Sequence, residues 1–238
     1  NRDLYENPTN FLEAIIAAQE SEGMAFSDED IFANVCTLLL AGEDTTANTI
    51  AWTVDYFLQY PGHYQRARDE VDEILGDDSV VQSLEQAAQL PFVEAVYSET
   101  MRLKPVAPLN AMEPNEDVEL MGHLIPRGTV IMMLNRYIAN QPSTFGEPEK
   151  FDPERWLTND KERGCPHDAS VFLPFGTGPR FCPGRNLALV QLRSVLAMLV
   201  RNFEVELADP AVEVAEKLAF TMMPTNLNVR LKKRAADA

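Results

Sequence analysis

The amino-acid sequence predicts a mainly α-helical fold with a small β portion. Apolar residues recur at helical spacing over most of the stretch up to Leu103, short β-type segments follow up to Met133, and one more helical stretch precedes a β-type tail. Of the 238 residues, 45% are hydrophobic and 24% are charged. This is the composition of a globular chain that can bury a sizeable core.

Two helices are predicted at the start of the chain. Apolar side chains at positions 11, 12, 15 and 16 indicate a helix over 10–20. Ser27 followed by Asp30 is a capping-box pattern, and because no proline occurs before Pro61, we expect one long helix over 27–60. The middle of this helix is apolar almost all round and is therefore expected to be buried. Its apolar residues there are Val35, Leu38, Leu39, Leu40 and Ala41.

Two shorter helices and then short strands follow. Amphipathic spacing predicts helices over 61–75 and 92–103, and Pro105 ends the second. Runs of β-type residues at 118–121 and 129–133 flank glycine and proline turn residues, which predicts short strands joined by turns.

The rest of the chain begins with a Pro- and Gly-rich stretch, 141–184, that has little periodicity. A structureless loop of this length is uncommon unless it has a function. A helix is predicted over 187–200, and the tail over 218–231 is expected to form a hairpin that turns at Pro224-Thr225-Asn226.

Composition excludes several classes of function. The formal net charge of −17 argues against nucleic acid as a partner, because phosphate binding needs clustered Lys and Arg. Cys36, Cys165 and Cys182 are too few and too scattered for a disulfide framework or a Cys-rich zinc site. No stretch is apolar enough to span a bilayer, and the first residues lack a signal-peptide pattern. A cytoplasmic location is therefore expected, with any membrane anchor left to residues upstream.

The segment 175–184 holds the residues best suited to chemistry. Its three glycines let the backbone turn tightly and approach a flat group closely. Cys182 stands just before a predicted helix, where backbone N–H groups and the helix dipole stabilise a thiolate, and Arg180 adds a positive charge nearby. Such a thiolate suits iron, with the arginine placed for an acidic cofactor group. The alternative is a small core cysteine, which is the usual role of an isolated free cysteine.

The same segment has the pattern F-x-x-G-x-R-x-C-x-G with every fixed position filled, and it resembles the haem-thiolate signature of the cytochrome P450 family. The fixed positions are Phe175, Gly178, Arg180, Cys182 and Gly184. Many members also have a cation just after the position of Pro108 that meets a haem propionate, and this chain has none there. The resemblance therefore implies Arg180 as the propionate contact.

A second mark of the family occurs within the long helix predicted over 27–60. Ala41-Gly42-Glu43-Asp44-Thr45-Thr46 resembles the motif of the family's distal helix. By this resemblance, Ala41 and Gly42 leave room for the cofactor. Asp44 and Thr45 supply a carboxylate and a hydroxyl that relay protons toward the oxygen being reduced.

Two further marks follow in the expected order. Glu99-Thr100-Met101-Arg102 matches the family's E-x-x-R, and the spacing of three puts Glu99 and Arg102 on one helix face. Pro153-Glu154-Arg155-Trp156 resembles the element whose arginine, here Arg155, completes a buried Glu-Arg-Arg network. The implied role of this network is structural.

The resemblance implies a monooxygenase that uses haem b (iron protoporphyrin IX), bound through Cys182, to insert oxygen from molecular oxygen into a small lipophilic substrate. Ala41 and the segment 221–225 correspond to places where the family contacts substrate. Electrons would come from a ferredoxin or a flavodoxin/reductase-type donor. A basic patch for such an acidic donor is one interpretation of five arginines, and ordinary solvated helix charges are the other. They are Arg66, Arg68, Arg185, Arg193 and Arg201.

The resemblance covers 1–238 as the C-terminal part of the family's single domain. The fold is therefore expected to be P450-like and incomplete at the N-terminus, and the 238 residues alone are expected to bind haem poorly. Two alternatives stay open. A haem-thiolate peroxygenase or isomerase of peroxides would keep the cofactor, although Asp44 and Thr45 argue against it because such enzymes have less need of a proton relay. A truncated remnant would neither bind haem nor catalyse a reaction.

Overall fold

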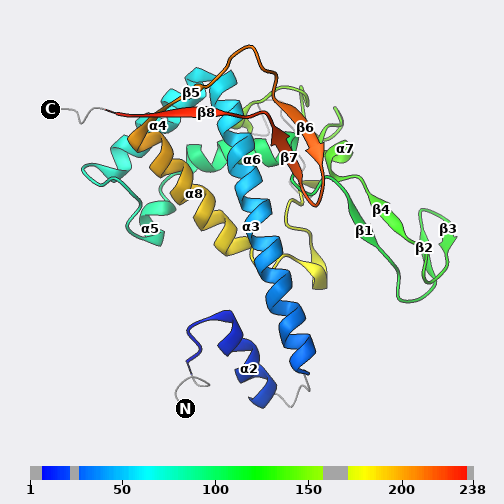
Figure 1. Cartoon of the computed structure of the whole chain (residues 1–238). Helices are drawn as coiled ribbons and strands as arrows, with labels where there is room; N and C mark the ends of the chain where they lie inside the picture. Colours follow the sequence, from blue (N-terminus) through cyan, green and yellow to red (C-terminus); the bar gives the residue numbers. More distant parts are fainter. Residues whose placement is uncertain (1–6, 22–26, 158–170, 235–238) are drawn as a thin grey trace. The chain divides into compact units, whose positions relative to one another are not determined.

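The computed structural model describes residues 7–21, 27–157 and 171–234. The chain divides into two compact units, Asn1–Asp44 and Thr45–Ala238, and the boundary falls inside helix α3 (Asp28–Gln59). Figure 1 shows the elements in chain order. The long helix predicted over 27–60 is confirmed as α3. No helix within the described ranges has both the length and the apolar character needed to cross a bilayer.

The first unit contains α2 (Phe11–Ser21) and the first half of α3. Asn10 Oδ1 accepts a hydrogen bond from the backbone N–H of Glu13 at 3.0 Å, and Ser27 Oγ accepts one from the backbone N–H of Asp30 at 3.1 Å. Asp30 Oδ2 accepts from the backbone N–H of Ser27 at 2.9 Å, so the predicted capping box is confirmed. The hydrogen bonds that Asp30 Oδ2 accepts from the hydroxyl of Ser27, at 2.7 Å, and from its backbone N–H hold the pKa of Asp30 below its usual value.

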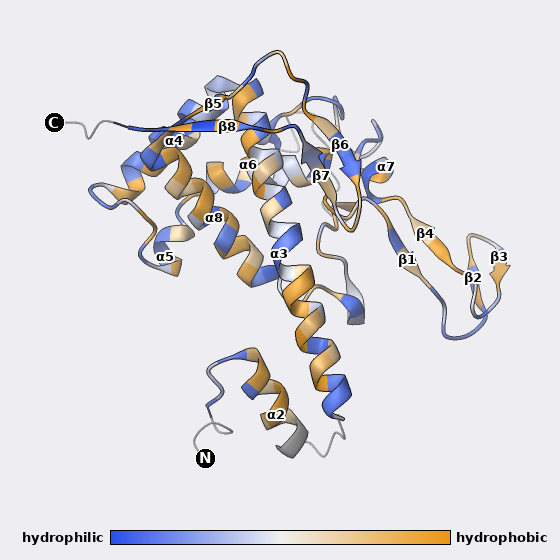
Figure 2. Cartoon of the chain, in the orientation of Figure 1, coloured by the Kyte–Doolittle hydropathy of each residue, from blue (hydrophilic) through white to orange (hydrophobic). Residues whose placement is uncertain are grey.

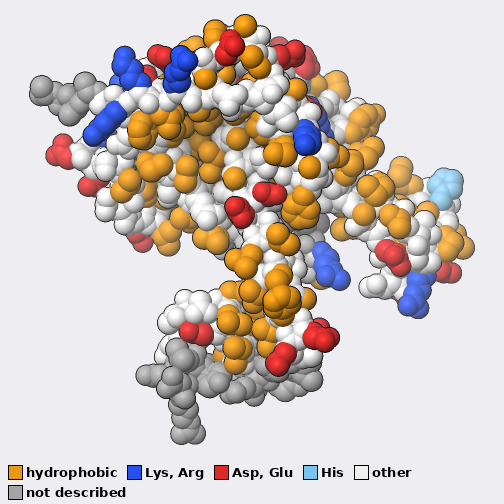
Figure 3. Space-filling view, viewed as in Figure 1, with side chains coloured by type: hydrophobic (Ala, Val, Ile, Leu, Met, Phe, Trp, Pro, Cys, Tyr) orange, Lys and Arg blue, Asp and Glu red, His pale blue; other side chains and the backbone are white. Residues whose placement is uncertain are grey.

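The first half of α3 carries exposed apolar side chains, so the burial expected from its sequence is wrong for this structure. Phe32 is 71% exposed, Leu39 68% and Leu40 67%. Figure 3 shows hydrophobic side chains over this part of the helix. A helix that is apolar all round is buried only where other elements cover every side, and α2 is the only other helix described in this unit.

The core of the second unit lies among α4 (Pro61–Leu75), α6 (Pro91–Leu103), α8 (Arg185–Asn202) and the second half of α3. The short helix α5 (Leu84–Ala87) packs against α8. Figure 2 shows hydrophobic residues recurring along α8. The helices predicted over 61–75, 92–103 and 187–200 are therefore confirmed. Buried core residues include Phe57, Val71, Val93, Val96, Leu192, Leu196 and Val200.

A carboxylate of α4 caps the first turn of α6. Glu70 accepts hydrogen bonds from the backbone N–H groups of Phe92 and Val93, at 2.7 and 3.0 Å. The residue before the helix, Leu90, has no side-chain acceptor of its own. Burial raises the pKa of Glu70, and the two N–H groups oppose this rise. The cap fixes the start of α6 against α4.

The described residues form four two-stranded antiparallel sheets. Figure 1 shows the sheets that contain β1 to β4 on the right, away from α4 and α8. The strands predicted near 118–121 and 129–133 are confirmed as β2 and β4, and the short helix α7 (Asn135–Ala139) follows. The pairs are β1 (Asn110–Met112) with β4 (Ile131–Met133), β2 (Val118–Leu120) with β3 (His123–Ile125), β5 (Phe203–Leu207) with β8 (Val229–Lys233), and β6 (Ala215–Leu218) with β7 (Met222–Thr225).

The tail differs from the hairpin predicted over 218–231. β7 pairs back with β6, while β8 pairs with β5, the strand that follows α8. Of the predicted turn Pro224-Thr225-Asn226, the first two residues lie in β7, opposite Glu216 and Ala215 of β6, so the predicted turn is wrong for them. Asn226 follows β7 and has a φ of 64°, a left-handed conformation that asparagine tolerates. The chain therefore turns at Asn226 between two sheets, and the predicted pairing of strands within one hairpin is wrong.

The described part of the Pro- and Gly-rich stretch includes the short 3₁₀ helices η1 (Pro153–Trp156) and η4 (Gly178–Arg180). Residues 158–170, which include Cys165, lie outside the described residues.

Asp55 of α3 is a buried carboxylate with 6% of its surface exposed. Gln59 Nε2 donates a hydrogen bond to Asp55 Oδ2 at 2.8 Å. Burial raises the pKa of Asp55, and the positive charge of Lys104 and the Gln59 hydrogen bond oppose the rise. The ionised carboxylate is therefore less favourable in the folded chain than in the unfolded one.

Replacing Asp55 with Asn is expected to raise the free energy of unfolding at neutral pH. Because the folded-state pKa lies above the unfolded value, the wild-type chain loses stability as the pH rises through the folded-state pKa, and the Asp55→Asn variant does not. The two free energies should converge below the unfolded pKa of about 3.9. Urea unfolding across this pH range measures the difference. The exposed Asp77→Asn is the control, and a less stable Asp55→Asn variant at neutral pH would contradict the prediction.

Candidate functional site

The ligand loop, residues 175–184, is closed by its own backbone. The backbone N–H of Cys182 donates to the carbonyl of Phe175 at 2.9 Å. Gly176 and Gly178 have φ values of 69° and 66°, a conformation that strains any residue with a Cβ atom. The loop therefore doubles back on itself and brings its aromatic start beside its cysteine.

Cys182 is a free, half-buried cysteine just before α8. Its carbonyl accepts a hydrogen bond from the backbone N–H of Arg185, the first residue of α8, at 3.3 Å. Gly184 caps the helix, and a Cβ atom there would lie 3.8 Å from Cys182 Sγ. The glycine keeps this side of the sulfur uncrowded.

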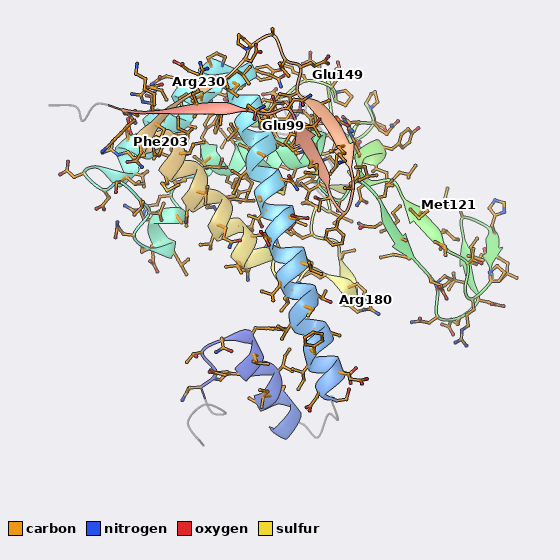
Figure 4. All side chains as sticks on the ribbon, in the orientation of Figure 1. Glu99, Met121, Glu149, Arg180, Phe203 and Arg230 are labelled. Carbon is orange, nitrogen blue, oxygen red and sulfur yellow. The ribbon has the colours of Figure 1, made fainter. Side chains whose placement is uncertain are left out.

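Arg180 is an exposed residue of the ligand loop and lies on η4, where Figure 4 labels it. Among the residues that the structure describes, Arg180 forms no ion pair, so its charge is available to an anion. Phe181 next to it is 45% exposed. A thiol donor, an available guanidinium and an exposed ring in one loop fit the haem that the sequence resemblance implies, with its iron, its propionates and its flat apolar face.

The distal-helix motif lies on a regular part of α3. Ala41, Gly42 and Asp44 belong to the first unit, whereas Thr45 opens the second, to which Cys182 also belongs. The helix continues through all four without a break. A Cβ atom at Gly42 would meet nothing within 4 Å, Asp44 is exposed, and Thr45 is half-buried.

The structure brings Glu99, Arg102 and Arg155 together in a buried network, and Figure 4 labels Glu99 among the helices. Glu99 Oε1 accepts hydrogen bonds from Arg102 Nη2 at 2.8 Å, Arg155 Nε at 2.9 Å and the backbone N–H of Asp152 at 3.0 Å. Glu99 Oε2 accepts from Arg102 Nε and Trp156 Nε1, both at 2.9 Å. Glu99 and Arg102 have no exposed surface.

The two arginines also donate to main-chain oxygens of the segment that follows α7. Arg155 Nη1 donates to the carbonyl of Gly146 at 3.2 Å. Because Arg102 belongs to α6, its hydrogen bonds hold that helix against the segment that leads to η1. The acceptors of Arg102 are Ala139 O at 3.0 Å, Pro148 O at 2.7 Å and Lys150 O at 3.1 Å.

Sequence reasoning missed two partners of Glu99. The sequence analysis predicted a network role for the arginine of this motif and none for the indole of Trp156. The backbone N–H of Asp152 leaves no signal in the sequence. One signal for Trp156 was available, because the indole N–H of a buried tryptophan usually finds a hydrogen-bond partner.

The basic patch considered for an electron donor is largely neutralised. Four of its five arginines form ion pairs, and the fifth, Arg185, is exposed, with its guanidinium 5.9 Å from the ring of Phe175. The interpretation as a continuous five-arginine patch is therefore wrong. The pairs are Arg66 with Glu154, Arg68 with Glu204, Arg193 with Glu94 at 2.6 Å, and Arg201 with Asp72 at 2.8 Å.

The segment 221–225, predicted to contact substrate, is anchored to α3. Thr221 Oγ1 accepts from Asn48 Nδ2 at 2.9 Å, and the carbonyl of Met222 accepts from Trp52 Nε1 at 3.1 Å. Thr221 and Met222 are buried, at 4% and 3% exposure. Met222 also lines an open hollow of about 570 Å³ whose apolar walls include Pro108, Leu109, Leu134 and Leu218.

Comparison with known proteins gives one family. The family model described as Cytochrome P450 matches residues 1–231. Cytochrome P450 4V2 of Homo sapiens is 30% identical over 228 residues, which are 95% of this chain and 43% of that protein. Cytochrome P450 27C1 of Danio rerio is 33% identical over 207 residues, which are 87% of this chain and 38% of that protein. The chain thus spans less than half the length of these curated relatives.

Solved structures support the same fold. The heme domain of cytochrome P450DA matches with a TM-score of 0.80 and 27% sequence identity, over 90% of this chain and 47% of that chain. The predicted mainly α, P450-like fold is therefore confirmed.

Replacing Glu99 with Gln is expected to lower the free energy of unfolding by about 3–5 kcal/mol, because it leaves two buried guanidinium groups without their carboxylate. Such a loss is a large part of the about 5–15 kcal/mol that stabilises a typical domain. Urea unfolding at neutral pH measures it. Glu149→Gln, at an exposed carboxylate of the same region, is the matched control. Equal losses in the two variants would contradict a special role for Glu99.

Proposed function

Because the chain belongs to the cytochrome P450 family, we propose that the full-length protein is a haem-dependent monooxygenase that inserts one atom of molecular oxygen into a lipophilic organic substrate. The observation that carries the proposal is the ligand loop itself. A free cysteine stands directly before α8, in a loop closed by the hydrogen bond from Cys182 to Phe175 and shaped by two glycines with positive φ.

The proposed ligand of the haem iron is Cys182. Haem b held by a thiolate supplies the electron-rich iron that activates oxygen. Phe175, Gly178 and Gly184 shape the loop so that backbone and ring can approach the flat face of the cofactor closely. Arg180, which is exposed, neutralises a propionate.

Four residues of α3 have proposed roles on the oxygen-binding side. Ala41 and Gly42 have small side chains and leave space on the helix for the cofactor and the substrate. Asp44 takes up protons from solvent, consistent with its exposure, and Thr45 passes them on through its hydroxyl. Glu99 and its two arginines hold the ligand loop in a fixed position relative to α6 and take no part in the chemistry.

The proposed substrate is lipophilic because the segment 221–225 places Met222 in an apolar hollow with Leu109 and Leu218. Electrons come from a ferredoxin or a flavodoxin/reductase-type donor. With the other four arginines of the former patch ion-paired, Arg185 at the start of α8 is the residue of that set left to contact an acidic donor near the ligand loop.

The central experiment is the spectrum of the reduced full-length protein under carbon monoxide. We expect a Soret band of the thiolate-ligated type, and we expect Cys182→Ala to abolish it, because the substitution removes the only proposed iron ligand. Cys36→Ala is the matched control, since Cys36 is the other described free cysteine and lies on α3. A thiolate-type band that survives in Cys182→Ala would refute the assignment.

The same preparation separates the monooxygenase from the peroxygenase reading. Product formed with oxygen, donor and reductant, but lost in Asp44→Asn and Thr45→Ala, supports a chain that delivers protons to oxygen. Product formed equally well with peroxide alone by wild type and both variants supports the peroxygenase or isomerase. A protein that takes up no haem supports the remnant.

The 238 residues expressed alone are expected to bind haem well below one equivalent, because they span less than half the length of the relatives they match. Haem titration followed by absorbance measures the stoichiometry, and the full-length protein serves as the reference. One equivalent of haem with a thiolate-type carbon monoxide spectrum from the 238 residues would contradict this expectation.

A further inference from the structure

We propose that Trp156 is a positioning residue that couples the buried Glu99 network to the ligand loop and so sets the position of Cys182. The inference rests on the proposed function, because it treats Cys182 as the haem ligand. It goes beyond the Glu-Arg-Arg network, because the ring of Trp156 adds a contact with Phe172, in the chain that enters the ligand loop.

The first contact of Trp156 is polar. Its indole Nε1 donates to Glu99 Oε2 at 2.9 Å, and the other described donor to this oxygen is Arg102 Nε. An oxygen of a buried carboxylate that loses one of two donors leaves charge poorly solvated. The hydrogen bond therefore fixes the indole ring at a defined distance from α6.

The second contact of Trp156 is aromatic. Its ring lies against Phe172, with centroids 4.6 Å apart and planes inclined at 50°. The ring of Phe145 is a further aromatic neighbour, with its centroid 6.2 Å from that of Trp156. Phe145 is fully buried, and the guanidinium of Arg102 lies 5.0 Å from its ring. The indole is thus held between the ion-pair network and the chain that precedes the ligand loop.

Phe172 passes this constraint to the cysteine through a short stretch of backbone. Phe172 and Phe175 both pack against the hydrophobic core. The backbone N–H of Gly176 donates to the carbonyl of Leu173 at 3.0 Å, and that of Cys182 donates to the carbonyl of Phe175 at 2.9 Å. A shift of the ring of Phe172 therefore moves the base on which the loop closes.

The contact needs tryptophan and not merely an aromatic ring. Phenylalanine at 156 would retain much of the packing against Phe172 but would lack the N–H that reaches Glu99 Oε2. The indole N–H donates to the Glu99 carboxylate at 2.9 Å. The N–H thus fixes the position of Trp156 against Glu99, and the ring transmits this position to Phe172.

The test uses the haem-free full-length protein with every cysteine other than Cys182 replaced by Ser, Cys36 and Cys165 among them, so that alkylation by iodoacetamide reports on Cys182 alone. We expect Trp156→Phe to raise the native-state alkylation rate about tenfold, the factor that corresponds to losing one hydrogen bond to a charged group. The matched control is Trp52→Phe. Trp52 is 1% exposed and its indole donates to the neutral carbonyl of Met222, so this variant loses a buried indole hydrogen bond at another site without affecting a charged group.

A second variant separates positioning from folding. Replacing Trp156 with benzothienylalanine keeps the shape of the ring and removes only the N–H. We expect it to be folded and to show the same faster alkylation. If it fails to fold, or if neither Trp156 variant alkylates faster than Trp52→Phe, the proposal is overturned and Trp156 serves only the core.

Reconstitution with haem provides the second readout. We expect Trp156→Phe to show a larger fraction of haem without thiolate ligation in the reduced carbon monoxide spectrum, and Trp52→Phe to match wild type. The alkylation result does not depend on haem, so it decides the positioning role even if Cys182→Ala refutes the proposed function. Faster alkylation combined with an unchanged haem spectrum would overturn the link between this contact and the ligand.

Discussion

A carboxylate with no exposed surface is stable only where donors surround it, and Glu99 meets this condition with five hydrogen bonds from described residues. The donors come from α6 itself, from η1 and from the backbone N–H of Asp152 just before η1. Glu99 and Arg155 are 56 residues apart in the chain. Burying this charge therefore requires α6 and η1 to meet. Arg102 extends the requirement by donating to the carbonyl of Ala139, the last residue of α7, and to two carbonyls between α7 and η1.

The other end of α6 is held by a second carboxylate. Glu70 of α4 caps its first turn through Phe92 and Val93, so α6 is fixed at its start by α4 and near its end by the Glu99 network. α8 packs against both α4 and α6. Because the ligand loop runs directly into α8, the same two carboxylates orient the helix that begins just after Cys182. The loop is thus anchored from the helix side and, through Phe172, from the side of η1.

The helices were predictable because spacing, caps and prolines act locally: α3, α4 and α6 follow from Ser27, Gly76 and Pro105. The Glu99–Arg102 pair was predictable from its spacing of three, whereas Arg155 needed a resemblance because nothing local links it to Glu99. The partners of β7 and β8 could not be read from Asn226, since a turn residue encodes a change of direction and not a choice of strand. The predicted burial of Leu39 and Leu40 is wrong for a similar reason. Hydropathy gives the preference of a side chain for an apolar environment and does not say which other elements cover it.

Charge on this chain acts locally near the cysteine. The net charge of −17 on these 238 residues would repel the proposed acidic electron donor at a distance, and screening at physiological ionic strength would limit that repulsion to about 8 Å. Asp72 binds both Arg201 and Arg234, which removes positive charge from the α4 and α8 surface. Arg180 and Arg185, on either side of Cys182, are exposed. For the proposed acidic donor, this arrangement favours contact at the ligand loop over long-range steering, because the exposed positive charges lie beside the proposed iron ligand.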